Sequence, residues 1–323
     1  MSRRDLKISS KLLMLAGVCA ASLTVSCSSS FDTSKGADDQ ARDYAGCQIS
    51  GEASGPSDVS GIINGKTLKP NSRIALSTVM IYTRGAGSGG DGGTICTGLL
   101  IAKDLVLTAA HCVRYEPGLS VEERRSKTMV FASVDPVCAI LGQKKMSIAF
   151  EASEVVVHPS YSNERKVNDM ALIFLSRQVE APMRPMRIAL EPEAVAADSA
   201  VFVAGYGRTS DVHEQDKSDA VLRFSRLRPV EAAESFNLRG QMISNRFDGA
   251  FLLLRNDETS AGCSGDSGGP AMIQKNGLLT SVGVASFVYN KDFGAFSCHS
   301  RIAYTRISAY KDWLISNSRG RLR

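Results

Sequence analysis

The stretch Gly265-Asp266-Ser267-Gly268-Gly269-Pro270 decides the fold, and Thr108-Ala109-Ala110-His111-Cys112 precedes it far upstream. In such a glycine-rich turn two backbone N–H groups, here those of Gly265 and Ser267, can converge on a developing oxyanion. That arrangement suits acyl transfer. Gly-Asp-Ser-Gly alone is also an ordinary tight turn, since glycine and aspartate dominate turns for backbone reasons. The motif therefore needs partners elsewhere in the chain.

A third motif, Asn168-Asp169-Met170-Ala171-Leu172, lies between the other two. A serine hydroxyl is a weak nucleophile until a neighbouring imidazole takes its proton, so His111 is the candidate base. A buried carboxylate keeps such an imidazole in one tautomer and stabilises its charged form, and Asp169 is the candidate. We predict a catalytic triad of His111, Asp169 and Ser267, with Gly265 and Ser267 as oxyanion donors.

The three motifs, in the order His, Asp, Ser, resemble those of chymotrypsin-like serine proteases rather than subtilisins or α/β-hydrolases. The resemblance covers about residues 62 to 316. It implies an all-β fold of two six-stranded antiparallel barrels and a serine endopeptidase that acts through an acyl-enzyme. A catalytically silent relative that serves as a binding module is the alternative. Silent relatives usually lose a triad residue, and this chain keeps all three.

Short β-branched runs separated by turn residues predict strands throughout the chain. They are Ser77–Thr83, Leu105–Ala110, Met129–Ser133, Glu154–His158, Ala171–Leu175, Ala200–Ala204, Ala250–Leu254 and Leu278–Ala285. Helical spacing of apolar residues predicts one amphipathic helix over 308–317. We assign the first barrel to residues 62–180 and the second, with this helix, to 181–323. The final Arg319, Arg321 and Arg323 are expected to form a frayed, solvated end.

Gly61-Ile62-Ile63-Asn64-Gly65 is similar to the Ile-Val-Gly-Gly with which mature members of the family begin. In the family, cleavage there frees an amino group that pairs with the residue before the nucleophile, here Asp266. An unpartnered buried charge costs about 3 to 5 kcal/mol, so the uncleaved chain is expected to have a disordered, poorly active site. A strand that begins after a turn would also explain the motif. Because Ser60 and Gly61 precede Ile62, we expect an activator that prefers small residues, this protein itself included.

The resemblance also implies a specificity pocket, and its positions are Ala261, Gly262, Ser286, Phe287, Val288 and Ile302. Ala261, six residues before Ser267, replaces the aspartate with which trypsin-like members bind Lys or Arg. The branched Val288 stands where wide-pocketed members have glycine, and Ile302 stands at a second wall position. The pattern resembles an elastase pocket, which accepts small aliphatic side chains. The segment from Ser286 to Val288 is the one that binds substrate backbone in the family.

Eight cysteines are present, of which Cys19 and Cys27 belong to the N-terminal segment. The even remainder suits an oxidising compartment. By resemblance, Cys96 pairs with Cys112 behind the histidine, and Cys263 pairs with Cys298 beside the pocket. By elimination, Cys47 is left to pair with Cys138, which would keep the propeptide attached after cleavage.

Residues 1–27 have the pattern of a targeting segment, with basic residues followed by the apolar stretch from Leu12 to Val25. The segment ends at Cys27 in what resembles an imperfect bacterial lipoprotein signal. Two outcomes stay open, a lipid anchor at Cys27 that attaches the protein to the cell envelope, and simple secretion. Residues 28–61 are rich in Ser, Gly, Asp and Ala and have few apolar side chains, so we expect a flexible tether and propeptide.

The composition of the 323 residues, 43% apolar and 22% charged, is that of an ordinary globular protein. The formal charge of +5 falls to +2 once the four basic and one acidic side chains of residues 1–26 are removed. This balance leaves no basic footprint for nucleic acid. No metal-binding or nucleotide-binding motif appears, so we expect neither a metal nor a cofactor. The expected partners are protein or peptide substrates and a protease inhibitor, and the expected state is a monomer.

Overall fold

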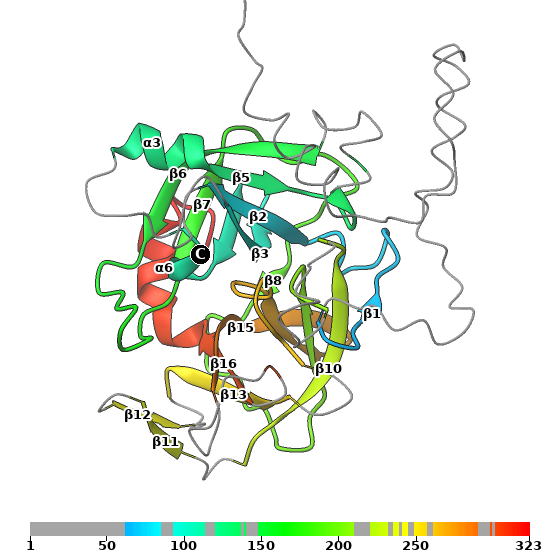
Figure 1. The fold of residues 1–323 in the computed structure, drawn as a ribbon, viewed down its shortest axis with the longest axis vertical. Coiled ribbons are helices and arrows are strands. Elements are labelled where there is room, and N and C mark those ends of the chain that lie inside the picture. Colours follow the sequence, from blue (N-terminus) through cyan, green and yellow to red (C-terminus); the bar gives the residue numbers. More distant parts are fainter. Residues whose placement is uncertain are drawn as a thin grey trace, which may run out of the picture.

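The computed structural model describes residues 62–84, 93–113, 120–136, 139, 148–209, 220–231, 235–238, 241–244, 249–256, 261–289, 298 and 301–323. Its strands form two closed six-stranded barrels that lie side by side, as Figure 1 shows, and the predicted fold class is confirmed. The predictions for Cys27, Cys47 and Cys138 fall outside the described residues. Among the described residues, no helix has the length and apolar character needed to cross a membrane.

The first barrel closes because its first strand pairs with the strands on both sides of it. Its strands, in ring order, are β2 (Thr78–Arg84), β3 (Gly93–Ala102), β4 (Leu105–Thr108), β7 (Ala171–Leu175), β6 (Ala149–Val157) and β5 (Thr128–Phe131). All pairings in this ring are antiparallel. The interior is filled by fully buried aliphatic side chains such as Leu99, Leu105 and Leu172. This packing is the main source of the barrel's stability.

A short helix, α3 (Val121–Lys127), precedes β5 and was not predicted from the sequence. Ser120 caps it: the hydroxyl accepts a hydrogen bond from the N–H of Glu123, and the Glu123 carboxylate accepts one from the N–H of Ser120. This reciprocal pair satisfies two donors that a helix start otherwise leaves without partners.

The second barrel follows the same principle, with β9 pairing on one side with β10 and on the other with β14. Its strands, in ring order, are β9 (Val201–Gly205), β10 (Arg223–Pro229), β13 (Phe251–Arg255), β16 (Arg301–Arg306), β15 (Leu278–Tyr289) and β14 (Pro270–Lys275). β1 (Lys66–Thr67) adds to β10, and β11 (Ser235–Leu238) and β12 (Gln241–Ser244) form a separate hairpin. Every predicted run overlaps an observed strand, whereas the barrel strands β3, β10, β14 and β16 and the short strands outside the barrels had not been predicted.

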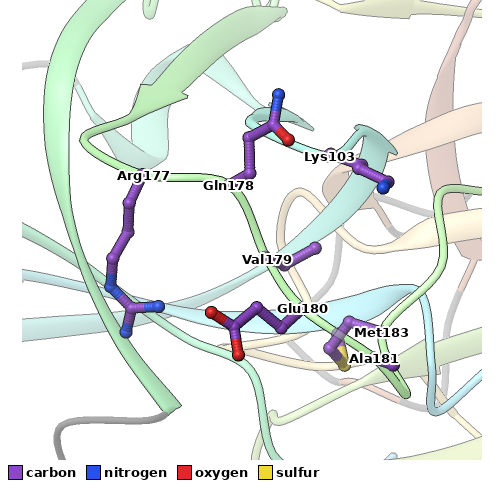
Figure 2. Close-up of a pocket in the computed structure, with 7 residues that line it drawn as sticks. All are labelled: Lys103, Arg177, Gln178, Val179, Glu180, Ala181 and Met183. Atoms are coloured by element: carbon purple, nitrogen blue, oxygen red, sulfur yellow. The ribbon is translucent and has the colours of Figure 1, made fainter.

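The connection between the barrels runs along the first barrel before it joins the second. The N–H of Met186 donates to the carbonyl of Leu100 at 2.8 Å, and β8 (Arg187–Ile188) then pairs in parallel with β15. Figure 2 shows a pocket of about 610 Å³ beside this connection, lined by Lys103 and by residues 177–181 and 183. None of the predicted site residues lines it.

The chain ends in a 3₁₀ turn (Ser308–Tyr310) and the helix α6 (Lys311–Asn317), which together match the predicted helix. Leu314 of α6 is buried in the core of the first barrel, so the chain end returns to that barrel, as Figure 1 shows.

The prediction of a frayed tail is wrong for Arg319 and Arg321, which contact the protein although both residues stay exposed. The guanidinium of Arg321 makes two hydrogen bonds of 2.7 Å to Asp104 and lies 5.0 Å from the centre of the Phe174 ring. Arg319 lies over the same ring, at 4.8 Å. The planar guanidinium matches both a carboxylate and an aromatic face, so these cations dock on the protein.

Candidate active site

The first barrel brings His111 and Asp169 together through two neighbouring strands. His111 lies in a 3₁₀ turn (Ala110–Cys112) shortly after β4, and Asp169 lies two residues before β7. β4 and β7 are antiparallel, with Thr108 opposite Ala171, so the end of one strand meets the start of the other. His111 Nδ1 lies 2.7 Å from Asp169 Oδ2, and the His111 N–H donates to Asp169 Oδ1 at 2.9 Å. One carboxylate thus holds both the ring and the backbone of His111.

The carboxylate of Asp169 is fully buried. Its third donor comes from the second barrel: the hydroxyl of Ser286 donates to Oδ2 at 2.5 Å. Burial alone would raise the pKa of Asp169, but the charge of His111 and the hydrogen bonds from His111 and Ser286 outweigh it, so the pKa is below its ordinary value. Asp169 is thus an anion in the folded protein at neutral pH. Sequence reasoning had placed Ser286 among the substrate-binding positions and missed this side-chain contact.

The residue before Asp169 is also restrained. Asn168 has a φ of 54°, in the left-handed region that asparagine tolerates better than most residues. Its side chain donates to the carbonyl of Ser160 at 2.8 Å and accepts from the hydroxyl of Tyr310 at 3.1 Å. Burial raises the pKa of Tyr310 to about 12, so this hydroxyl keeps its proton. The C-terminal segment thereby helps to position the carboxylate.

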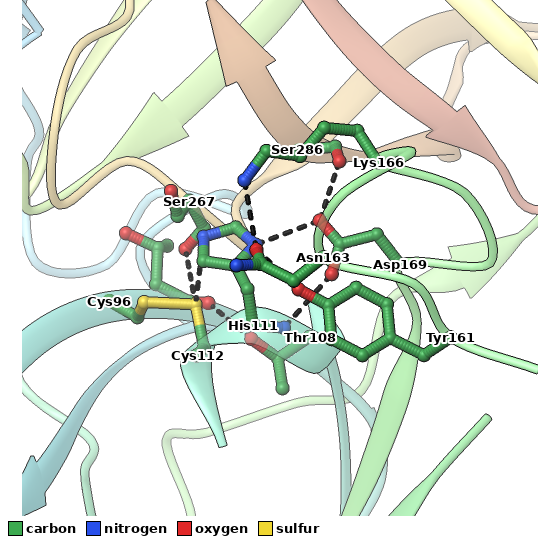
Figure 3. A network of polar contacts seen from close by, with 11 residues as sticks. Cys96, Thr108, His111, Cys112, Tyr161, Asn163, Lys166, Asp169, Ser267 and Ser286 are labelled. Atoms are coloured by element: carbon green, nitrogen blue, oxygen red, sulfur yellow. Dashed lines mark hydrogen bonds and ion pairs between the residues drawn. A yellow bond between two sulfur atoms is a disulfide. The ribbon is translucent and has the colours of Figure 1, made fainter. Parts of the chain in front are cut away.

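Ser267 comes from the second barrel, in the turn that leads into β14. Figure 3 shows its side chain beside the ring of His111, with Asp169 and Ser286 on the far side of that ring. No hydrogen bond joins Ser267 to His111 within the described chain. Nucleophile and base are often separated like this before substrate binds and approach each other in the complex. The structure thus brings all three predicted residues to one place.

The N–H groups of Gly265 and Ser267 have no acceptor among the described residues, so both are available to an incoming oxygen. Gly265 has a φ of 97° and approaches Gly207 so closely that an added Cβ would lie 2.7 Å from the Gly207 Cα. The carbonyl of Ser264 accepts a hydrogen bond from the N–H of Arg208 at 2.8 Å. Because the C=O and N–H of a trans peptide point in opposite directions, this bond turns the Gly265 N–H away from Arg208.

Asp266 is buried within the same turn. Its carboxylate accepts the N–H of Gly207 and the N–H of Cys263, both at 2.9 Å. Burial raises its pKa to about 7, although these two donors and the charge of Arg223 oppose the shift. Two backbone donors, which the sequence does not reveal, thus solvate the carboxylate in the folded chain. That the uncleaved chain has a disordered, poorly active site stays a prediction.

The predicted activation segment lies against the second barrel. Ile62 is 1% exposed and belongs to the core of that barrel. The carbonyl of Ile63 accepts a hydrogen bond from the N–H of Ala261 at 3.1 Å. Ala261 lies two residues before Cys263, whose N–H donates to the Asp266 carboxylate. Ile62 has a φ of 42°, a strained value for a β-branched residue.

Two of the predicted specificity positions carry branched side chains that share one face of the second barrel's sheet. Val288 and Ile302 are opposite one another on β15 and β16, so both point to the same face of the sheet. A Cβ added to Gly262 would lie 2.8 Å from Ile302 Cδ1, so the Ile302 side chain reaches across to Gly262. Ala261 is fully buried. Phe287 points elsewhere and packs against the ring of Phe251, 5.8 Å away between centres.

Two disulfides join the cysteine pairs that the resemblance implies, Cys96 with Cys112 and Cys263 with Cys298. Within the described chain, the group of residues with metal-ligand spacing is Cys96, His111 and Cys112. Its two sulfur atoms are bonded to each other and offer no thiolate. Cys112 Sγ lies 3.5 Å from the carbonyl oxygen of Ser267, so this bridge is packed against the nucleophile's turn.

Comparison with known proteins agrees with this geometry. A family model described as trypsin matches residues 62–314. The chain is 29% identical over 240 residues to chymotrypsin-like elastase family member 1 of Canis lupus familiaris, an alignment that covers 70% of this chain and 82% of the relative. It is 24% identical to granzyme B of Rattus norvegicus, covering 78% and 89%. It is 28% identical to trypsin-3 of Salmo salar, covering 68% and 82%.

The raised pKa of Asp266 predicts a pH-dependent stability of the intact chain. Because the pKa is about 7 in the folded state and about 4 in the unfolded state, stability falls as pH rises between these values and is constant above the higher one. The free energy of unfolding of the parent, relative to that of Asp266→Asn, should fall by roughly 2 to 3 kcal/mol between pH 5 and pH 8. Urea unfolding at each pH measures it. The exposed Asp198→Asn is the control. If the difference in unfolding free energy between the parent and Asp266→Asn is the same at both pH values, the prediction is contradicted.

Proposed function

The chain belongs to the trypsin family, and on that premise we propose that it is a serine endopeptidase that hydrolyses peptide bonds through an acyl-enzyme. The observation that carries the proposal is the buried Asp169 carboxylate bonded to His111, with Ser267 beside the imidazole. A catalytically silent binding module would not need this ionised, solvent-excluded partner for the histidine. The complete set of groups therefore favours the enzyme.

Each residue then has a distinct role in acyl transfer. His111 takes the proton of the Ser267 hydroxyl as the oxygen attacks the substrate carbonyl, and later gives that proton to the leaving amine. Asp169 keeps Nδ1 of His111 protonated, so that Nε2 is the basic nitrogen that faces the serine, and stabilises the imidazolium that forms. Ser286 donates to the same carboxylate oxygen as His111 and keeps Asp169 in place. Water then attacks the acyl-enzyme, with His111 acting as base a second time.

The N–H groups of Gly265 and Ser267 stabilise the tetrahedral intermediate. Both are free of acceptors within the described chain, and the peptide that carries the Gly265 N–H is fixed by the bond from Arg208 to Ser264. Donors that are already oriented toward the developing charge need no reorganisation during the reaction. This preorganisation accounts for a large share of the rate enhancement in acyl transfer.

The pocket geometry favours substrates with small aliphatic side chains at the cleavage site. Val288 and Ile302 face the same side of the sheet, and Ile302 reaches Gly262. A large aromatic side chain would collide with them. Ala261 offers no carboxylate to a basic substrate, so cleavage after Lys or Arg is not favoured. The preference for small residues supports an elastase-like specificity.

Cleavage before Ile62 would activate the enzyme further. The new ammonium would pair with the buried Asp266 and replace the proton that this carboxyl carries when its pKa is near 7. Cleavage would also relieve the strained backbone of Ile62. The contact of Ile63 with Ala261 supports the proposal, because Ala261 lies only five residues before Asp266 in the chain.

The protein is proposed to act after export. Its two disulfides fit an oxidising compartment. The targeting pattern of residues 1–27 supports either secretion or attachment to the cell envelope through a lipid on Cys27. Protein or peptide substrates are the expected partners, with a protease inhibitor as a second, and the enzyme is expected to act as a monomer.

A fluorophosphonate probe should label Ser267 of the folded protein after cleavage before Ile62, and Asp169→Asn should lower both labelling rate and kcat. The expected loss in kcat is about 10⁴-fold, because the histidine loses the carboxylate that fixes its tautomer. Labelling is measured by mass spectrometry of the Ser267 peptide, with the exposed Asp198→Asn as the matched control. A folded and processed chain that does not react at Ser267 would favour the binding module.

Peptide substrates that differ at the residue before the cleaved bond should test the pocket. The wild type should cleave after Ala or Val faster than after Phe or Arg. Val288→Gly and the double change Val288→Gly with Ile302→Gly should raise the Phe-to-Ala ratio of kcat/KM, by about tenfold or more, because they open the pocket. The ratio is independent of the active fraction of each preparation. Faster wild-type cleavage after Phe or Arg than after Ala would overturn the assignment.

The N-terminus of Ser267→Ala tests the activation step. We expect this variant to stay intact when it is purified alone and to begin at Ile62 after incubation with a trace of active wild type. N-terminal sequencing reads both outcomes. A variant that begins at Ile62 without added enzyme would exclude obligatory self-activation. Cleavage at another bond would contradict the proposed activation site.

A further inference from the structure

Thr97 of β3 is a fully buried polar residue of the first barrel that contacts the oxyanion turn of the second. We propose that Thr97 is a positioning residue, a latch that fixes the Gly265 to Ser267 turn for catalysis from across the seam between the barrels. The inference rests on the proposed function, since it concerns the rate of acyl transfer. Nothing in the three sequence motifs points to this residue.

The hydroxyl of Thr97 makes two hydrogen bonds, one as a donor and one as an acceptor. Oγ1 donates to the carbonyl of Gly265 at 2.9 Å and accepts from the N–H of Tyr206 at 3.1 Å. Its single proton is therefore committed to Gly265. A side chain of the same shape without the hydroxyl would leave a carbonyl of the turn and a buried N–H without partners, and such groups are costly in a protein interior.

The backbone of Thr97 is bonded to the same turn. Its N–H donates to the carbonyl of Ser267 at 2.8 Å, and its own carbonyl accepts the hydroxyl of Thr108 at 2.9 Å. The turn approaches so closely that a Cβ added to Gly268 would lie 2.3 Å from the Thr97 carbonyl oxygen and 2.1 Å from Thr108 Oγ1. One residue of the first barrel thus contacts the carbonyls of both residues whose N–H groups line the oxyanion site.

These contacts matter for catalysis because Gly265 has the most permissive backbone in the turn. Its φ of 97° is open to glycine, which populates many other conformations as readily. Arg208 fixes the peptide on one side of Gly265 through the carbonyl of Ser264, and Thr97 fixes the peptide on the other side through the carbonyl of Gly265. With both peptides held, the Gly265 N–H stays where the transition-state oxygen develops, and a small misplacement there costs much rate.

A purely structural role in the barrel seam is the competing explanation, and it makes a different prediction. A structural residue changes the fraction of folded enzyme, whereas a positioning residue changes the rate of each folded active site. The test therefore normalises every rate to the number of sites titrated with a fluorophosphonate. It compares Thr97→Val, which removes the hydroxyl, with Thr97→Ser, which keeps it. The control is Thr78→Val, because Thr78 is an equally buried threonine of β2 whose hydroxyl donates to the carbonyl of Ile74, outside the turn.

For Thr97→Val we expect kcat per titrated site to fall by about 10- to 100-fold, with KM changed by less than about threefold. Thr97→Ser should stay within about threefold of the wild type, and Thr78→Val should keep the wild-type kcat. A peptide boronate that forms a tetrahedral adduct on Ser267 should lose affinity for Thr97→Val in parallel with kcat, because the adduct uses the oxyanion site. If Thr97→Val does not fold, Thr97→Ala carries the same test, since its smaller side chain leaves room for water at the two freed groups.

Two negative results have different meanings. A folded wild type processed to begin at Ile62 that neither reacts with the fluorophosphonate nor cleaves peptides refutes the proposed function. If the wild type is active and Thr97→Val keeps both its kcat per titrated site and its boronate affinity, the positioning role of Thr97 is refuted, and the proposed function is not. A fall in kcat that Thr97→Ser does not rescue also refutes the positioning role, because the hydroxyl would then not be the group that acts.

Discussion

The buried carboxylate of Asp169 is the group on which the rest of the site depends. It receives two hydrogen bonds from His111 of the first barrel and one from Ser286 of the second. A carboxylate excluded from water stays ionised only when donors and a positive partner compensate for the lost solvation. Because those donors come from both barrels, the carboxylate holds His111 at the interface between the barrels, where Ser267 lies.

The oxyanion turn depends on the same seam from the other side. Within the second barrel, Asp266 accepts the N–H groups of Gly207 and Cys263 and so shapes the turn from inside. From the first barrel, Thr97 contacts the carbonyls of Gly265 and Ser267. Both restraints act on one short segment, the turn from Gly265 to Ser267.

The motifs led to His111, Asp169 and Ser267, which the structure brings together, because acyl transfer requires a few residue types in a fixed order. Regular alternation likewise predicted strands such as Ala171–Leu175, which matches β7. The misses have a common cause. Ser286 and Thr97 are ordinary hydroxyl residues in their local sequence, and α3 would have required attention to the capping pair Ser120 and Glu123. Arg321 was taken for a solvated end because its partners, Asp104 and Phe174, are remote in the chain.

The sequence by itself determined the all-β architecture and gave Ser267, His111 and Asp169 as the candidate nucleophile, base and carboxylate. Each is encoded by residues that are neighbours in the chain or by short-range alternation. Only the tertiary structure decided which groups surround them. Asp169 meets Ser286 across 117 positions, and Thr97 meets Gly265 across 168. Such pairs form because closing two barrels places distant strands at a single seam, and hydrogen bonds at that distance leave no periodic or local pattern in the sequence.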